Sequence, residues 1–187
     1  MKYDILEAME TSLILKEKVS NVDLQQKFIT NNDIEKQKVY SEIKKELNGC
    51  EEFIFSVAFI TDSGVSVIIE ELKNLADKKI KGKILTGDYQ TFTQPKALER
   101  LMQFPNIEIK MIRDVPLHTK GYFFKKENHW NFIIGSSNLT QNALAKNKEW
   151  NIKVSSLGKG KVYAEVFNEF EQLWNSAVVV DESLLEK

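Results

Sequence analysis

The chain has 187 residues, of which 42% are hydrophobic, and it carries 26 Lys and Arg residues against 27 Asp and Glu residues. This length and apolar content can bury a full core, which excludes a disordered or fibrous chain and favours one compact domain. The balanced total charge is no signature of a nucleic-acid-binding protein, so any such role must rest on local charge.

Cysteine and histidine are scarce. Cys50 is the single cysteine, and the two histidines are His118 and His129, so the sequence predicts no disulfide framework, no metal site and no other cofactor. Asp4 and Glu7 interrupt the apolar residues near the start, which excludes a signal peptide or a spanning helix there. We therefore expect a cytoplasmic protein without membrane contact.

The first expected elements are helices. Residues 3–17 carry apolar side chains at helical spacing, which predicts an amphipathic helix within an N-terminal extension, residues 1–27. The main domain is expected over residues 28–176, and its first helix spans about 32–49, between an Asn/Asp cap signal and a glycine. Residues 177–187 are expected to form a polar, peripheral C-terminal tail.

The middle of the chain alternates between strands and helices. Apolar residues predict strands over about 52–60, 81–87 and 106–112, and helices over about 64–77 and 95–104 lie between them. A strand, a helix and a second strand in this order are typical of parallel strands joined by crossover helices.

The pattern changes after Pro116. Residues 118–126 and 130–135 form two apolar runs separated by a short polar stretch, which predicts an antiparallel hairpin. A short helix over 138–145, a strand over 149–154 and a helix over 161–174 follow. The sequence therefore predicts an α/β fold with a mixed, mostly parallel sheet and helices on both faces.

Polar residues with anion-binding chemistry cluster around the hairpin. His118 and Lys120 are two residues apart on an expected strand, so their side chains point the same way and can converge on one ligand. The next strand gives way to a helix at Gly135, Ser136, Ser137 and Asn138. Such a junction can direct backbone N–H groups and hydroxyls toward a phosphate.

These residues suggest a reaction. If Lys120 and Asn138 hold the non-bridging oxygens, a neutral His118 can attack phosphorus and form a phosphohistidine, without any metal. Glu149 could hold the second imidazole nitrogen and select the reactive tautomer. Ser136 and Ser137 would either contact the substrate, together with Gly135, or cap the following helix.

The same residues resemble a known family. His118-Thr119-Lys120, the Gly-Ser-Ser-Asn segment and Glu149 resemble the active-site motif of the phospholipase D superfamily, in particular its metal-independent nucleases and restriction endonucleases. The surrounding sequence, with VAFI, KILTGDY, GSSNLTQNAL and NKEWN, resembles the N-terminal phospholipase D-like domain of bacterial DEAD/DEAH-type helicases. The resemblance covers residues 28–174. Lys125 stands where the family motif has an aspartate, a departure that weakens a lipase reading more than a nuclease reading.

The resemblance implies a function and a partner. Members build one site from two motif copies, with one histidine as nucleophile and the other as acid. This chain has one motif copy, so the resemblance implies a homodimer that cleaves DNA, as part of a helicase-type or restriction-type protein. A non-catalytic nucleic-acid-binding or dimerisation module of the same fold is the alternative, and a phospholipid hydrolase is less favoured.

Overall fold

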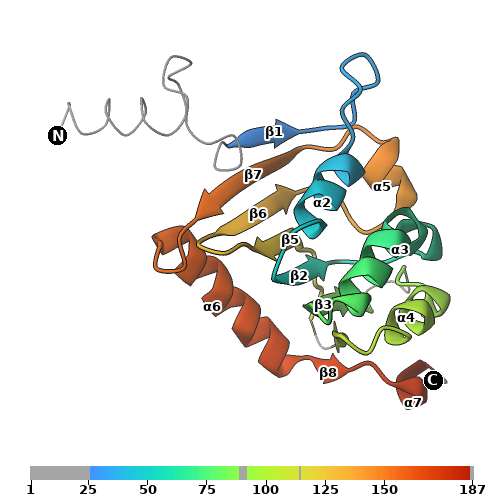
Figure 1. Cartoon of the computed structure of the whole chain (residues 1–187). Coiled ribbons are helices and arrows are strands. Elements are labelled where there is room, and N and C mark those ends of the chain that lie inside the picture. Colours follow the sequence, from blue (N-terminus) through green and yellow to red (C-terminus); the bar gives the residue numbers. More distant parts are fainter. Residues whose placement is uncertain (1–25, 89–91, 114, 186–187) are drawn as a thin grey trace.

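The apolar run EFIFSV forms β2 (Glu52–Val57), which lies inside an eight-stranded sheet of order β1-β7-β6-β5-β2-β3-β4-β8. The computed structural model describes residues 26–88, 92–113 and 115–185, and Figure 1 shows its arrangement. Phe53 and Phe55 belong to one core cluster and Ile54 to a second, so β2 is buried on both faces.

The parallel part of the sheet follows β2. β2 pairs in parallel with β3 (Lys81–Gly87), and β3 pairs in parallel with β4 (Ile107–Ile112). The crossover helices are α3 (Asp62–Asp77) and α4 (Pro95–Met102). Thr61 caps α3, because its side chain accepts a hydrogen bond from the Gly64 amide.

The other strands pair antiparallel: β5 (Lys120–Lys125), β6 (Trp130–Gly135), β7 (Asn151–Ser156), β1 (Lys27–Ile29) and β8 (Val178–Val179). The prediction of a mixed α/β sheet is confirmed, but the expectation of mostly parallel strands is wrong. In the described part of the chain, parallel pairing between strands is confined to β2, β3 and β4, and an isolated parallel bridge joins Ile60 to Leu139. The short turn between β5 and β6 cannot hold a crossover, and β1 and β8 are too short to give a strand pattern.

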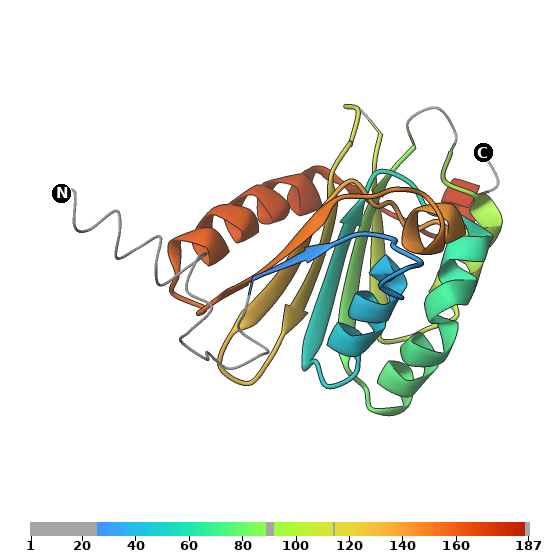
Figure 2. The ribbon, with the colours of Figure 1, turned by 90° about the horizontal axis from the view of Figure 1, so that it is seen from above.

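Helices cover both faces of the sheet, as predicted (Figure 2). One face carries α3 and α4 together with α2 (Val39–Leu47) and α5 (Gln141–Ala145). The other face carries α6 (Lys161–Ser176), whose Phe170 and Trp174 pack in the second core cluster with aromatic residues of β5 and β6. Within the described ranges, no helix combines the length and apolar character that a membrane span requires.

The C-terminal segment belongs to the fold, whereas the helix predicted over 3–17 lies outside the described residues. The segment expected to be a peripheral tail instead continues the fold, because β8 pairs with β4 and Val180 is 6% exposed. A final turn, α7 (Glu182–Leu185), packs its leucines against the core.

Gly64, in the first turn of α3, allows this helix to lie directly against the segment after β6. A Cβ atom at position 64 would lie 2.0 Å from the Leu139 carbonyl oxygen and 2.8 Å from the Thr140 Cα atom. The same contact includes a hydrogen bond of 3.1 Å from the Thr61 amide to the Leu139 carbonyl. Because Leu139 follows Asn138, the absence of a side chain at Gly64 helps to position the Gly-Ser-Ser-Asn segment.

Replacing Gly64 with Ala should therefore lower the free energy of unfolding by about 1–3 kcal/mol, since the new methyl group meets rigid backbone. Urea denaturation measures this change. Gly158→Ala is the matched control, because no atom lies within 4 Å of a Cβ at that position. Equal stability of the two variants would contradict the role assigned to Gly64.

Candidate active site

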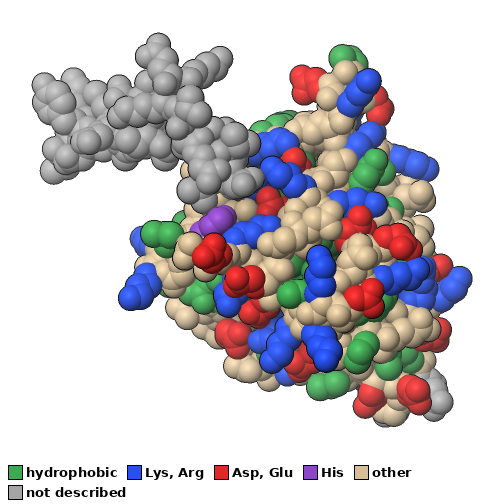
Figure 3. All heavy atoms as spheres, viewed as in Figure 1, with side chains coloured by type: hydrophobic (Ala, Val, Ile, Leu, Met, Phe, Trp, Pro, Cys, Tyr) green, Lys and Arg blue, Asp and Glu red, His purple; other side chains and the backbone are tan. Residues whose placement is uncertain are grey.

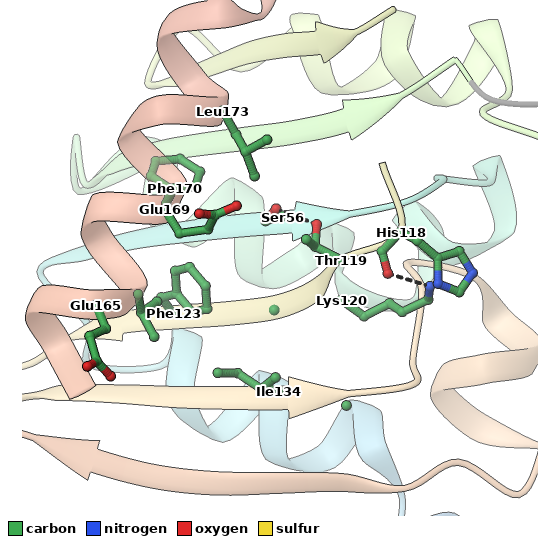
Figure 4. Close-up of a pocket in the computed structure, with 13 residues that line it drawn as sticks. Ser56, His118, Thr119, Lys120, Phe123, Ile134, Glu165, Glu169, Phe170 and Leu173 are labelled. Atoms are coloured by element: carbon green, nitrogen blue, oxygen red, sulfur yellow. Dashed lines mark hydrogen bonds between the residues drawn. The ribbon is translucent and has the colours of Figure 1, made fainter. Parts of the chain in front are cut away.

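His118 and Lys120 meet at the start of β5. Lys120 is the first residue of the strand and His118 lies just before it, rather than inside a strand as predicted. The Lys120 side chain is buried, with 8% exposure, and its Nζ donates a hydrogen bond of 2.8 Å to the His118 carbonyl oxygen. The His118 side chain is exposed, and both residues line one pocket (Figure 4). The structure thus brings the two residues together at one site.

The charge of Lys120 is tuned by its surroundings. Burial lowers the pKa of Lys120 below the ordinary lysine value, although the negative charge of Glu149 acts in the opposite direction. Burial raises the pKa of Tyr122, and the Glu149 charge adds to this effect. Glu149 is therefore close enough to Lys120 to stabilise its charged form.

Glu149 does not have the partner that the sequence suggested. Its Oε2 accepts a hydrogen bond from the Ser136 hydroxyl. Across the described ranges, no hydrogen bond joins Glu149 to His118, so this structure does not contain the expected orientation of the imidazole. The Ser136 amide also donates to the Trp150 carbonyl at 3.0 Å, and the Trp150 amide donates to Ser136 Oγ at 3.1 Å. These bonds join the end of β6 to the start of β7.

Ser137 has a structural role. It is fully buried; its amide donates to Asn151 Oδ1 at 3.4 Å, and the Asn151 side-chain amide donates to Ser137 Oγ at 2.9 Å. The Tyr122 hydroxyl donates to the Ser137 carbonyl at 3.0 Å. Ser137 is thus held within the fold, and its contact with a substrate stays a prediction. Neither serine caps α5, because Thr140 accepts the bond from the Ala143 amide.

Asn138 and Gly135 complete the segment. Asn138 is 7% exposed, and its Oδ1 accepts a hydrogen bond of 3.3 Å from the Phe59 amide. Its side-chain amide donates to no other described residue. At Gly135, a Cβ would lie 2.2 Å from the Trp150 carbonyl, so a glycine lets β6 and β7 approach closely.

A groove that the sequence did not reveal opens beside His118. It has a volume of about 470 Å³ and lies between the start of β5 and α6 (Figure 4). Its walls are mainly apolar, but α6 contributes two carboxylates. Its lining includes Phe123, Val166, Glu165, Glu169, Phe170 and Leu173. Sequence patterns could not locate it, because it depends on how α6 crosses the sheet.

Charges elsewhere are mixed. On the face shown in Figure 3, Lys and Arg side chains are interspersed with Asp and Glu side chains. Among the residues that the structure describes, no group of three His, Cys, Asp or Glu side chains could hold a metal ion.

The sheet with helices on both faces, and a His-x-Lys segment entering β5, define a phospholipase D-like domain. The family model described as "Cardiolipin synthase, PLD-like domain" matches residues 43–174, which is more than half of the chain. The chain therefore belongs to this family. No curated protein matches the sequence.

Solved structures share the fold at low sequence identity. NucT from Helicobacter pylori superposes with a TM-score of 0.67 at 13% identity, covering 83% of this chain and 99% of that chain. Nuc from Salmonella typhimurium, a phospholipase D family member, has a TM-score of 0.64 at 15% identity, with coverages of 84% and 100%. Phosphatidylserine synthase from Haemophilus influenzae has a TM-score of 0.62 at 13% identity, covering 95% of this chain but 45% of that chain.

Replacing Asn151 with Ala should lower the free energy of unfolding by about 1–3 kcal/mol, because the buried Ser137 amide and hydroxyl lose their partner. Thermal and urea unfolding measure the change. Asn142→Ala is a suitable control, since Asn142 is exposed and its side chain bonds to no described residue. Wild-type stability of the Asn151 variant would refute the structural role of this pair.

Replacing Glu149 with Gln should lower the pKa of Lys120 further, because it removes the charge that opposes the effect of burial. The charged ammonium would then be lost at a lower pH than in the wild type. An NMR titration of the Lys120 Cε resonance measures this shift directly. Glu171→Gln, which removes a carboxylate paired with Lys83, should leave the titration unchanged; an upward or absent shift in the Glu149 variant would contradict the electrostatic assignment.

Proposed function

We propose that this domain is a metal-independent phosphodiesterase that cleaves DNA through a phosphohistidine intermediate. The observation that carries the proposal is the meeting of His118 and the buried Lys120, whose Nζ lies 2.8 Å from the His118 carbonyl. The family and the fold support, at a coarser level, an enzyme that acts on phosphodiesters.

The proposed reaction has two displacements. A ring nitrogen of neutral His118 attacks phosphorus, an N–P bond forms, and the bond to the leaving oxygen breaks. Lys120 and the side-chain amide of Asn138 stabilise the charge on the non-bridging oxygens. A second histidine protonates the leaving oxygen and then accepts a proton from the water that attacks phosphorus and breaks the N–P bond.

The second histidine would come from another copy of the chain, since the sequence holds one motif. An exposed apolar strip, defined as Phe28, Ile134 and Ile152, supports such a homodimer: Ile152 pairs with Phe28 on β1 and with Ile134 on β6. These side chains are 55%, 38% and 44% exposed, respectively. Lys153 reaches Glu46 on α2, so Ile152 points to the α6 face. A second copy on this face would cover the strip and face His118.

The main alternative is a binding or dimerisation module of the same fold without turnover. The bond between Glu149 and Ser136 favours it, because it leaves His118 without an orienting partner in the described chain. The apolar groove beside His118 is the observation that favours a phospholipid hydrolase. The association with a helicase or restriction protein stays a prediction.

Replacing His118 with Ala should reduce DNA cleavage in EDTA by roughly 10³-fold or more, because the nucleophile is lost. Cleavage of a labelled oligonucleotide measures the rate, and acid-labile ³²P on the wild-type protein detects the intermediate. His129→Ala is the matched control, since His129 lies in the turn at the other end of β5. Wild-type activity in the His118 variant would refute the mechanism, and DNA binding without cleavage by the wild type would favour the binding module.

A further inference from the structure

Trp150 is unusually exposed for a tryptophan. It has 73% exposure, whereas Trp130 and Trp174 have 7% and 5% and pack in the second core cluster. Leaving this ring in water gives up the stability that its burial would provide. The ring is therefore a candidate for contact with a ligand.

Trp150 is held close to the candidate site. Its amide and carbonyl both bond to Ser136, and it directly follows Glu149. The ring contacts Phe28 with centroids 5.9 Å apart and planes at 73°. This edge-to-face contact braces the indole ring while most of its surface stays accessible.

The charges around the site indicate where a polyanion would continue from the reacting phosphate. The groove beside α6 contains the carboxylates of Glu165 and Glu169, which repel phosphates. On the other side, next to Trp150, the Glu149 carboxylate already accepts a hydrogen bond from Ser136, and Lys148 Nζ donates one of 3.0 Å to the Asn31 carbonyl oxygen. The path past Ser136 and Trp150 therefore carries one hydrogen-bonded carboxylate against two in the groove, and is the less repulsive one for a nucleic acid.

We propose that Trp150 stacks on an unpaired nucleobase next to the phosphate held by His118 and Lys120. Aromatic side chains in single-strand-binding proteins stack on bases of any sequence, whereas a duplex covers the faces of its internal bases. This inference rests on the proposed function and specifies its substrate as nucleic acid with unpaired bases. Trp150 is a binding residue in this scheme and takes no part in bond cleavage.

Intrinsic fluorescence tests the proposal, because Trp150 is the exposed tryptophan among the three in the chain. In a His118→Ala background that prevents turnover, titration with single-stranded oligo(dT) should quench the emission. A sugar–phosphate oligomer of the same length without bases should cause no such quenching. Absence of quenching by saturating oligo(dT) would overturn the proposal.

Two variants separate stacking from general surface effects. Trp150→Ala should weaken oligo(dT) binding by about tenfold, the scale of one lost base stack, while Trp150→Phe should restore most of the affinity. Leu157→Ala, at an apolar residue that is 67% exposed beyond the end of β7, should leave the affinity unchanged. An equal loss of affinity for the base-free oligomer in Trp150→Ala would overturn the stacking role.

Two further readouts keep this inference distinct from the proposed function. Failure of the phosphohistidine mechanism would appear as DNA cleavage that persists in His118→Ala, whatever the Trp150 variants do. Because the proposed homodimer covers Phe28, which contacts the Trp150 ring, the accessibility of this ring is measured on the dimer by iodide quenching without nucleic acid. Loss of iodide quenching in the dimer would mean that the second copy covers the ring, and would refute the stacking role.

Discussion

The candidate site depends on a reciprocal pair of hydrogen bonds between Ser137 and Asn151. The buried Ser137 amide donates to the Asn151 side-chain oxygen, and the Asn151 side-chain amide donates to the Ser137 hydroxyl. The Tyr122 hydroxyl donates to the Ser137 carbonyl. Unpaired polar groups there would be costly, so the arrangement is strongly specified. It holds the end of β6 against the start of β7. This junction positions Ser136 and Asn138 after β6 and Glu149 before β7.

A second buried polar cluster determines which way β7 faces. Burial alone would raise the pKa of Glu46, but the hydrogen bond from Asn131 and the charges of Lys126 and Lys153 outweigh it, so that the pKa lies below its ordinary value. Lys153, 2% exposed, is thereby tied to α2. Since side chains alternate along a strand, Ile152 must point to the opposite face. The exposed apolar strip is thus a consequence of a buried ion pair.

The sequence was informative where residue patterns have a local cause. The continuous apolar run of β2 is a local feature and forms a central strand, as its pattern predicts. The short spacing of His118 and Lys120 keeps both at the start of β5, although His118 precedes the strand. The burial of Ser137 could not be predicted from the local sequence, because it depends on Asn151, which lies fourteen residues away at the start of β7. Residues 178–179 look like part of a tail in the sequence and become an edge strand only because β4 lies beside them.

The separation of roles within the Gly-Ser-Ser-Asn segment follows from these constraints. Ser137 is committed to the fold, Ser136 is bonded to Glu149 and Trp150, and the Asn138 side-chain amide donates to no described residue, so consecutive residues have different roles. Glu149 is shared between the two roles: it holds Ser136 and stabilises the charge of Lys120. A ligand that draws Ser136 away would release this carboxylate.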